Sequence, residues 1–367
     1  MNFDDLRIID AHIHQWDPLA TPREFSNLAR LLKYVPLPLS LAVRFANVRD
    51  REFVGSPAAY LNPYLPADYR ADAAGVPVEG IVHIEVEWHG KGPTAKAEET
   101  RWVAGLPFGV DTPPLTAILG SADPAAPGFT ELLDAHQSAS PLFRGIRTMV
   151  AHHPDPDVRV FTHDPDALTS RAFLDGFGEL ARRDLVFEAW VYSHQLPQVI
   201  ALARRYPEVT IVLDHLATPA GVFGAIGRET GQTPEKRHEL LQRWRDDIAE
   251  LATLPNVVAK VSGVAMPILG HPVPRPRHTT TAPVLLDRIR PLVTHALDCF
   301  GADRLIWGSN FPVDKPITTI AASATAVGTA ITEHGGDHAA LTRVFHDNAT
   351  RVYRIENAGD RHAGTIT

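Results

Sequence analysis

The sequence predicts an α/β protein in which eight parallel strands, each followed by a helix, close into a (β/α)₈ barrel. The chain has 367 residues, and barrels of this kind run from about 200 to more than 400 residues with their insertions. Short runs rich in branched side chains recur along it, and helical patterns alternate with them. Alternating strands and helices pair in parallel through right-handed crossovers. Eight such units favour a closed barrel over an open sheet.

The expected elements follow from local periodicity, with short apolar runs for strands and apolar residues three or four positions apart for helices. The expected strands are 7–11, 80–86, 115–119, 143–149, 185–191, 209–214, 256–261 and 304–307. The expected helices are 95–105, 129–138, 166–183, 195–206, 234–254, 283–300 and 318–333. The run at 115–119 gives the weakest strand signal, and the prediction of an eight-stranded barrel depends on including it.

Two connections are longer than an ordinary strand-to-helix loop. Residues 19–78, after the first strand, are rich in proline and tyrosine and are expected to contain helices that cover the barrel mouth. Residues 266–277, after the seventh strand, show no helical pattern. Both begin at carboxyl ends of strands, where barrel enzymes carry their active sites. We expect one domain over 1–356, followed by a flexible tail at 357–367.

Composition narrows the classes of function. The chain has 35 Lys and Arg against 43 Asp and Glu, for a net charge of −8, and 44% of its residues are hydrophobic. This balance is that of a globular protein and favours neither nucleic acid nor an anionic membrane surface as a partner. The sequence shows no signal peptide and no apolar run of membrane-spanning length. We expect a cytoplasmic protein with a small-molecule substrate, and a homo-oligomer stays open.

Histidines mark the ends of two expected strands. His12 and His14 end the first strand in the run IDAHIH, and alternation along a strand puts them on the same side of it. His215 directly follows the sixth strand, which delivers it to the same end of the barrel. Neutral imidazole is a ligand for zinc and similar ions. All three are candidate metal ligands, and His215 is also a candidate for proton transfer. The alternative is that they bond to loop backbone.

Other polar and aromatic residues fall near the same rim. His194 follows the fifth strand and is a catalytic candidate, with Tyr192 as its rival for the rim position and a candidate for substrate binding. Trp16, just beyond the first-strand histidines, is a second substrate-binding candidate. Arg147 ends the fourth strand, where it can clamp a substrate carboxylate with two hydrogen bonds. Asn310 follows the eighth strand; its amide can coordinate or donate, but it cannot act as a base.

The second strand carries three polar residues, His83, Glu85 and Glu87, on one face. The outer face of a barrel strand packs on helices, so we expect this polar set to point inward. Buried carboxylates are costly unless they are paired or bind a metal, which makes Glu85 or Glu87 a candidate catalytic residue. The alternative is a buried ion pair, with Lys260 of the seventh strand as the partner.

Seven segments, in this order, resemble the amidohydrolase-2 family of TIM-barrel metal-dependent hydrolases. They span nearly the whole chain except much of 19–78 and the tail. A single one of these motifs is weakly specific, but seven in order are specific. The segments are IIDAHIHQWDP (8–18), FRGIR (143–147), QLPQVIALARRYP (195–207), IVLDHLATP (211–219), NVVAKVSGV (256–264), RLIWGSNFPVDK (304–315) and FHDNATRVYRI (345–355).

The resemblance is strongest to the lactonase branch, which acts on sugar lactones and pyrone dicarboxylates. It implies a barrel that opens at the His12 and His14 end, with His215 in the family's DH motif and Arg147 at a position that holds substrate carboxylates. Asn310 departs from the family, because most relatives have aspartate there as metal ligand or base. The resemblance implies one divalent ion, zinc or manganese, or metal-independent catalysis in which Glu85 supplies the missing carboxylate.

The first hypothesis is a hydrolase that opens a lactone or related cyclic ester of a carboxylated small molecule by activated water. In it, Asn310 orients that water or stabilises the oxyanion. The second is a metal-dependent decarboxylase of an aromatic acid, which a related branch of the family suggests. The third is a redirected barrel, because Asn310 replaces the usual aspartate: a binding protein, or a cyclase or isomerase in a biosynthetic pathway.

Overall fold

The computed structural model describes residues 5–24, 26–34, 48–55, 60–272 and 278–356. Eight strands lie in chain order in one sheet, and each neighbouring pair from first to last is parallel. They are β1 (Ile8–Ile13), β2 (Val78–Ile84), β3 (Leu115–Ser121), β4 (Phe143–Met149), β5 (Val186–Trp190), β6 (Ile211–Leu213), β7 (Val257–Val261) and β8 (Leu305–Trp307).

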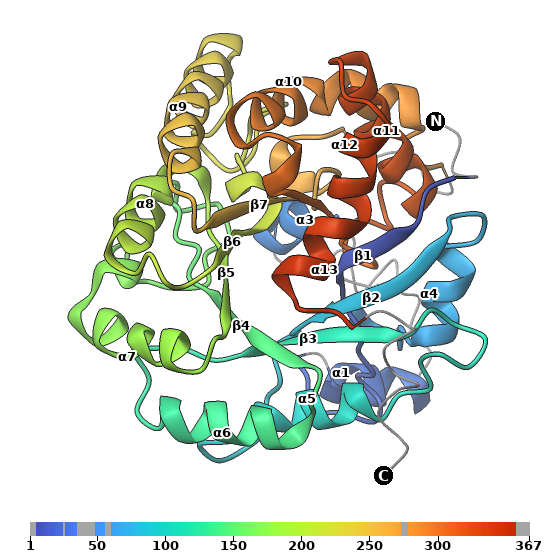
Figure 1. Cartoon of the computed structure of the whole chain (residues 1–367), viewed down its shortest axis with the longest axis vertical. Coiled ribbons are helices and arrows are strands. Elements are labelled where there is room, and N and C mark those ends of the chain that lie inside the picture. The colour runs from blue at the N-terminus through green and yellow to red at the C-terminus, as the bar shows by residue number, and fades with distance from the viewer. Residues whose placement is uncertain (1–4, 25, 35–47, 56–59, 273–277, 357–367) are drawn as a thin grey trace.

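The ring closes between β1 and the segment that follows β8. The amide of His14 donates to the carbonyl of Phe311 over 2.8 Å, and the amide of Asn310 donates to the carbonyl of His12 over 2.8 Å. Figure 1 shows most of the helices around the outside of the ring of strands. The predicted (β/α)₈ barrel, a TIM barrel with a long insertion after the first strand, is confirmed.

The helices alternate with the strands, as expected. After β2 they are α5 (Ala97–Ala104), α6 (Phe129–Ala139), α7 (Arg171–Arg182), α8 (Leu196–Arg205), α9 (Pro234–Ala252), α10 (Ala282–Phe300), α11 (Ile320–Glu333), α12 (His338–Thr342) and α13 (Asn348–Val352). Side chains cap several of them: Ser170, Thr233 and Thr319 accept from backbone amides in the first turns of α7, α9 and α11. Such caps satisfy amides that have no partner within the helix.

The two long connections contain structure of different kinds. Between β1 and β2 lie α1 (Ser26–Tyr34), α3 (Val48–Val54) and α4 (Pro66–Asp72), so the expectation of helices in 19–78 is confirmed. After β7 the described residues form only a short 3₁₀ helix, Pro267–Leu269. The predicted flexible tail at 357–367 lies outside the described residues, and the single domain over 1–356 stays a prediction.

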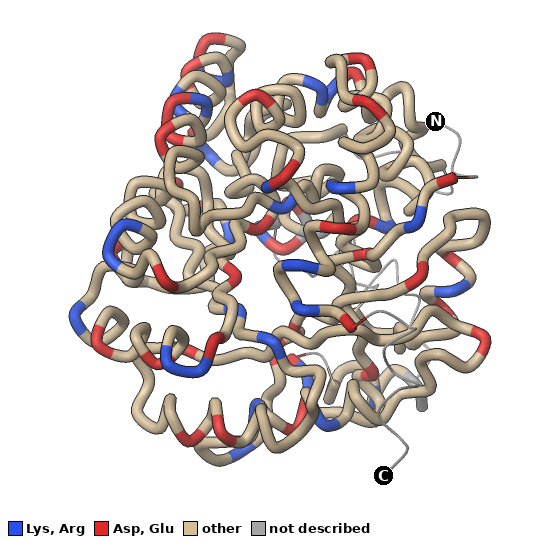
Figure 2. Tube along the Cα trace, in the orientation of Figure 1, with Lys and Arg blue, Asp and Glu red and all other residues tan. Residues whose placement is uncertain are grey.

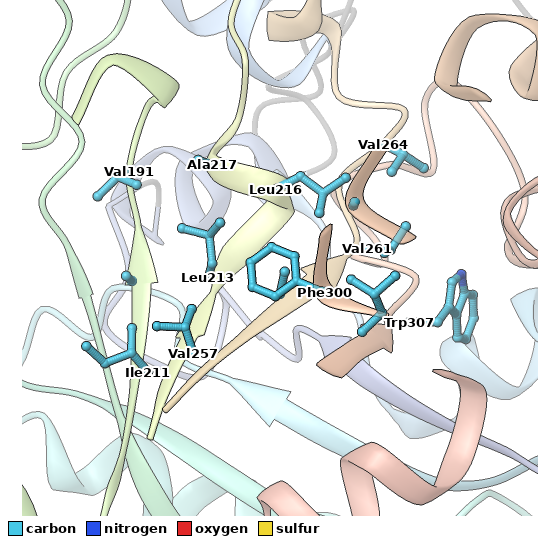
Figure 3. Packing of buried hydrophobic residues seen from close by; sticks show 14 of the residues in the cluster. Val191, Ile211, Leu213, Leu216, Ala217, Val257, Val261, Val264, Phe300 and Trp307 are labelled. Atoms are coloured by element: carbon cyan, nitrogen blue, oxygen red, sulfur yellow. The ribbon is translucent and has the colours of Figure 1, made fainter. Parts of the chain in front are cut away.

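The core has two layers, one inside the ring of strands and one between strands and helices. The inner layer includes Ile9, Ala11, Val82, Ile84 and Val258, with α13 residues packed beneath them. The outer layer is larger, and Figure 3 shows part of it, where Phe300 of α10 lies among strand residues. Burying each large aliphatic side chain stabilises the fold by roughly 1.5–3 kcal/mol. These layers fix the strand ends from which the polar residues project.

The orientation predicted for β2 is wrong for His83. The inward side chains are Val82 and Ile84, whereas the ring of His83 lies 3.6 Å from Glu99 of helix α5 and therefore faces the helical layer. Burial of this polar residue among the helices is tolerated because Glu99 is its polar partner. Glu85 follows the end of the strand, so the alternation rule does not apply to it. Its partner is Arg147, and Lys260 pairs with Glu188 instead.

Charge is mixed over the molecule. Figure 2 shows Lys and Arg interspersed with Asp and Glu along the outer helices, α9 among them. Within the described ranges, no helix combines the length and the apolar character that crossing a membrane requires. That no nucleic acid is a partner stays a prediction, as does the small-molecule substrate.

Candidate active site

Four of the predicted residues meet at the carboxyl end of the barrel. His12 lies in β1 and His14 directly follows it, with ring centroids 5.0 Å apart. His215 follows β6, and its ring lies 4.6 Å from that of His12. Asn310 follows β8, and its Oδ1 lies 3.2 Å from Nε2 of His14. All four are buried. We call this set the histidine cluster.

Asp10 holds the two sides of the barrel closure in place. Its Oδ1 accepts from the backbone amide of Ser309, and its Oδ2 accepts from the hydroxyl of Tyr69 on α4, each over 2.8 Å. The register of β1 against β2 shifts between Asp10 and Ile13. That irregularity lets His12 turn into the barrel while Ile13 packs outward. A β-bulge re-aims side chains in this way.

The backbone that carries His215 is strained. Residues 215–218 follow one another in the left-handed region, with φ of 53°, 50°, 61° and 38°, and non-glycine residues there cost about 1–3 kcal/mol each. Trp244 of α9 supports the turn by donating from its indole to the carbonyl of Leu216 over 2.8 Å. Gly263 lies against the imidazole: a Cβ at 263 would come within 2.6 Å of its Nδ1. Strain of this kind is typical of functional sites.

Asn310 links His14 to Asp314. Nδ1 of His14 lies 2.9 Å from the Ile84 carbonyl, which can only accept, so this nitrogen carries the hydrogen and Nε2 carries a lone pair. Nδ2 of Asn310 donates to Asp314 over 2.8 Å, which leaves its carbonyl oxygen facing that lone pair. Two arrangements satisfy this contact. A cation can lie between the two acceptors, or the amide can be reversed, so that its nitrogen donates to His14 and its oxygen accepts a hydrogen bond from protonated Asp314. Burial raises the pKa of Asp314 to about 7.

Beneath His12 lies a buried polar group formed by Lys260, Glu188, Asp214 and Tyr353, which we call the basal network. The ammonium of Lys260 lies 2.7 Å from Glu188, whose Oε1 also accepts from the Tyr353 hydroxyl over 2.6 Å. Burial, followed by the charge of Asp214, raises the pKa of Glu188 to about 8. Burial alone would raise the pKa of Asp214 as well, but Lys260 holds it below its ordinary value. One ionised carboxylate therefore balances the ammonium at neutral pH.

The basal network decides which nitrogen of His12 carries the hydrogen. Nδ1 of His12 lies 3.2 Å from the ammonium of Lys260 and 3.4 Å from Oδ1 of Asp214. If Asp214 accepts from Nδ1, the opposite nitrogen, Nε2, is left with a lone pair. If Lys260 donates to Nδ1, Nε2 becomes a donor. This nitrogen is buried and has no hydrogen-bond partner in the described part of the chain.

The histidines are neutral at physiological pH. Burial and the neighbouring Lys260 lower the pKa of His12 far below its ordinary value, and burial with His12 does the same to the pKa of His215. Burial and Arg147 lower the pKa of His14 to about 3. Neutral imidazole is the form that binds metal ions or accepts a proton.

The histidine cluster, together with Asp214 of the basal network, fits one divalent metal ion. One set of possible ligand atoms, from His12, Asp214 and His215, lies within 4.8 Å of one another. The unpartnered Nε2 of His12 and the facing acceptors of His14 and Asn310 are the features that a cation satisfies. Imidazole nitrogens with an oxygen ligand suit zinc and related ions.

A cavity opens above the cluster and is walled mainly by apolar side chains. His14, His215 and Asn310 lie at its polar end. The residues 19–78 contribute five lining side chains, so this insertion builds part of the pocket. The aromatic and aliphatic lining residues are Trp16, Phe53, Tyr60, Val86, Met149, Phe161, Trp190, Met266 and Val313. The charged lining residues are Arg23, Glu24, Asp50, Glu87, Arg147 and Arg159.

The two acidic residues after β2 have different surroundings. Glu85 is buried, and Arg147 donates from Nε to its carboxylate over 2.8 Å and from Nη2 to its backbone carbonyl over 2.7 Å. Glu87 lines the cavity with a backbone φ of 36°. Burial, followed by the charge of Glu85, raises the pKa of Glu87 to about 7. A carboxyl group poised near neutrality in a pocket is a candidate for proton transfer.

The remaining predicted residues are divided between the pocket and its surroundings. Trp16 and Arg147 line the cavity with the histidine cluster. Tyr192 is fully buried behind the wall, and its hydroxyl donates to the Arg159 carbonyl over 2.8 Å. His194 is not brought to the cluster; it lines a second hollow beside His153, with ring centroids 5.2 Å apart.

Several residues of the site were missed by sequence reasoning. Glu188 and Asp214 of the basal network were not singled out, and Lys260 was considered only as a partner for β2. The sequence does contain a signal for them, because a charged residue at an inward position of an otherwise apolar strand needs a buried partner. Arg159 lies in a connection without periodicity, so nothing in the sequence placed it at the pocket.

Replacing Lys260 by methionine tests the basal network. The variant leaves Glu188 and Asp214 buried without their cation, so we expect the free energy of unfolding to fall by about 3–5 kcal/mol, measured by urea denaturation. Adding Glu188→Met removes a buried carboxyl group that has lost its contact with Lys260 and should recover part of the loss. A loss under about 1 kcal/mol in Lys260→Met would contradict this interpretation, since exposed pairs contribute no more than that.

The sequence matches a protein family and several known proteins. Residues 9–355 match the family described as amidohydrolase, Amidohydro_2. The chain is 32% identical over 356 residues to the uncharacterized protein y4mH of Sinorhizobium fredii, covering 96% of this chain and 99% of that one. It is also 32% identical over 247 residues to an L-fucono-1,5-lactonase of Burkholderia ambifaria, covering 62% of this chain and 68% of the lactonase.

Solved structures share the fold over nearly the whole chain. The crystal structure of an amidohydrolase from Burkholderia multivorans with bound zinc superposes with a TM-score of 0.68 at 22% identity, covering 95% of this chain and 99% of that one. At this identity the likeness concerns the fold alone. Family membership is shown by the match to the family over residues 9–355. The chain belongs to the Amidohydro_2 family of the amidohydrolase superfamily.

Proposed function

We propose that this protein opens the ring of a lactone by hydrolysis at the histidine cluster. The observation that carries the proposal is the convergence of neutral His12, His14 and His215 with Asn310 at the polar end of one cavity. Identity to L-fucono-1,5-lactonases supports the same reaction class. Membership of a hydrolase family supports water as the nucleophile.

We infer that His12, His14, His215 and Asn310 would hold one divalent ion, zinc or manganese. A zinc-bound amidohydrolase and a decarboxylase complexed with manganese share the fold, with TM-scores of 0.68 and 0.54. Such an ion polarises a carbonyl and lowers the pKa of water. Asp214 would keep the hydrogen of His12 on Nδ1, which leaves Nε2 free to bind.

The protein's own groups account for the proton transfers. Ionised Glu87 takes a proton from the attacking water, whose oxygen bonds to the acyl carbon. The bond from that carbon to the ring oxygen then breaks, and Glu87 returns the proton to the leaving alkoxide. The product is a hydroxy acid, and atoms balance with one water consumed. The apolar walls exclude other water from the reacting atoms.

Arg147 is already paired, so it offers a substrate carboxylate no uncompensated positive charge. Glu85 already occupies its Nε and Nη2, and both residues are buried. The charge of Arg147 is therefore compensated before any substrate binds. For this reason the proposed reaction does not require a carboxylated substrate.

The pH dependence of kcat/KM tests the role of Glu87. Because the base must be ionised, and the pKa of Glu87 is raised to about 7 by burial and Glu85, activity should rise between about pH 5 and 8 with a midpoint near 7. Glu87→Gln should lower kcat/KM by about 100-fold or more and remove that limb. Initial rates across this range check both. An unchanged pH limb in the variant would exclude Glu87 as the base.

A substrate panel tests the proposed reaction itself. The purified protein is incubated with five- and six-membered lactones and with aromatic carboxylic acids, and acid release and carbon dioxide release are followed. We expect acid release from a lactone and no carbon dioxide from any acid. Carbon dioxide from an aromatic acid would overturn the proposal in favour of a decarboxylase. Turnover of neither class would favour a redirected barrel.

A further inference from the structure

We propose that the substrate is a small, uncharged lactone with an apolar substituent, in contrast to a polyhydroxylated or carboxylated one. This inference rests on the proposed lactone hydrolysis and names the class of lactone. It follows from three properties of the cavity: the chemistry of its walls, the pairing of its charges and its size. Each property comes from described residues around the histidine cluster.

The walls are built from aromatic rings that pack on one another. Trp16 stacks on Tyr60 with centroids 4.8 Å apart and planes 17° from parallel. On another side, Trp190 meets Phe53 and Phe161 edge-on, at 5.6 Å and 4.8 Å. The walls therefore offer π-faces and ring edges to whatever occupies the cavity. Such surfaces suit a ring or an alkyl group.

The wall has little hydrogen bonding to offer a sugar-like substrate. The indole of Trp16 already donates to the Asn62 carbonyl over 2.9 Å. Between these rings and the charged lining residues lie aliphatic and thioether side chains such as Val313, Met149 and Met266. Hydroxyl groups that enter such a wall lose water without gaining a partner, which is unfavourable. A polyol would thus find partners at the polar end and at the charged lining residues, but not along this apolar part of the wall.

The charges of the cavity are already paired. Arg147 is neutralised by Glu85, and Arg23 by Glu99 over 2.7 Å. Arg159 pairs with Asp50 over 2.7 Å. Its guanidinium also lies over the rings of Phe53 and Phe161, at 5.6 Å and 4.9 Å.

Carboxylates complete the lining. Glu24 and Glu87 face the same cavity, and Glu24 is 3.6 Å from the already paired Arg159. Among the described lining residues, no arginine lacks an acidic partner. An anionic substrate would meet paired cations and further negative charge, which disfavours it.

The size of the cavity limits the substrate to about one ring. Its volume is about 120 Å³. A cavity of roughly 150 Å³ in another protein is large enough for benzene. A six-membered lactone with a short alkyl group matches that scale and would fill the apolar part while its ester faces the histidine cluster.

A matched pair of substrates tests this inference. L-fucono-1,5-lactone and δ-hexalactone share a six-membered ring and its methyl group, and differ only in the ring hydroxyls. We expect kcat/KM, each corrected for the spontaneous rate in buffer, to be at least about 100-fold higher for δ-hexalactone. Equal or higher kcat/KM for the hydroxylated lactone would overturn the inference while leaving lactone hydrolysis intact.

Binding of the corresponding lactams separates the inference from the proposed reaction. Lactams resist hydrolysis, and calorimetric titration of the wild-type protein measures their dissociation constants. Tighter binding of the methyl lactam than of its hydroxylated counterpart, without turnover of any lactone, would show that the cavity prefers an uncharged apolar ring and would overturn the proposed reaction. Binding of neither lactam, or preference for the hydroxylated one, would overturn the inference.

A wall substitution provides the matched control. Val313→Thr adds one hydroxyl to the wall at nearly constant volume, whereas Val313→Ala changes volume without adding polarity. We expect Val313→Thr to reduce the preference for δ-hexalactone by about tenfold and Val313→Ala to retain it. The same preference in the threonine variant as in wild type would contradict an apolar wall as the origin of selectivity.

Discussion

Replacing either His12 or His215 by asparagine lowers kcat/KM for lactone opening by at least about 1000-fold. Each substitution removes a neutral imidazole from the histidine cluster, and the amide that replaces it is shorter and has no basic nitrogen. In His12→Asn the change also breaks the contact with Asp214. Initial rates of acid release measure the loss. Circular dichroism and thermal unfolding confirm that each variant is folded.

The matched control is His194→Asn. His194 lies near the same end of the barrel but lines a different hollow, beside His153. Its substitution should leave kcat/KM within about threefold of wild type, since surface changes away from a site have small effects. A large loss in His194→Asn together with full activity in His215→Asn would move the active site to that hollow and contradict the assignment.

Replacing Asn310 by aspartate is expected to lower activity by about 100-fold, although the resemblance to the family implies aspartate at this position. Nδ2 of Asn310 donates to Asp314 over 2.8 Å, and an aspartate would place two carboxylates at that distance. Two carboxylates so close cannot both ionise without a large cost. The position is also held in the left-handed region, with φ of 57°, which both residues tolerate. The loss would therefore arise from charge and not from backbone strain.

The double variant Asn310→Asp/Asp314→Asn restores the pair with its direction reversed, because the new amide at position 314 can then donate to the new carboxylate at position 310. We expect it to recover kcat/KM to within about tenfold of wild type. The measurement is the double-mutant cycle in kcat/KM, with thermal unfolding of all variants beside it. An Asn310→Asp variant as active as wild type would show that Asp314 does not govern this position.

The sequence was most informative where periodicity dominates. All eight strands and the alternating helices were predicted, since apolar runs repeat at strand and helix periods, and the run 143–149 matches β4 without change. The sixth strand is shorter than predicted, Ile211–Leu213, and at its carboxyl end the chain enters the left-handed turn that carries His215. Hydropathy carries no information on the backbone angle φ, so this turn could not be predicted from the sequence pattern.

The site was predicted in part for a physical reason. His12, His14, His215 and Asn310 end strands, and strand ends converge in a barrel, so topology alone brings them together. Pairing was harder to predict, because it depends on long-range neighbours. Glu85 proved to be the partner of Arg147, while Glu87, two residues on, faces the cavity. The distinction arises just past the end of β2, where alternation stops applying.

A tetrahedral analogue gives the most direct test that the histidine cluster is a hydrolytic centre. A cyclic phosphonate ester with the ring size of the lactone mimics the centre formed when water attacks, and calorimetry measures its dissociation constant. We predict binding at least about 100-fold tighter than that of the lactam with the same ring, and loss of this advantage in His215→Asn. A phosphonate bound no tighter than the lactam, or bound equally by wild type and His215→Asn, would contradict hydrolysis at this cluster.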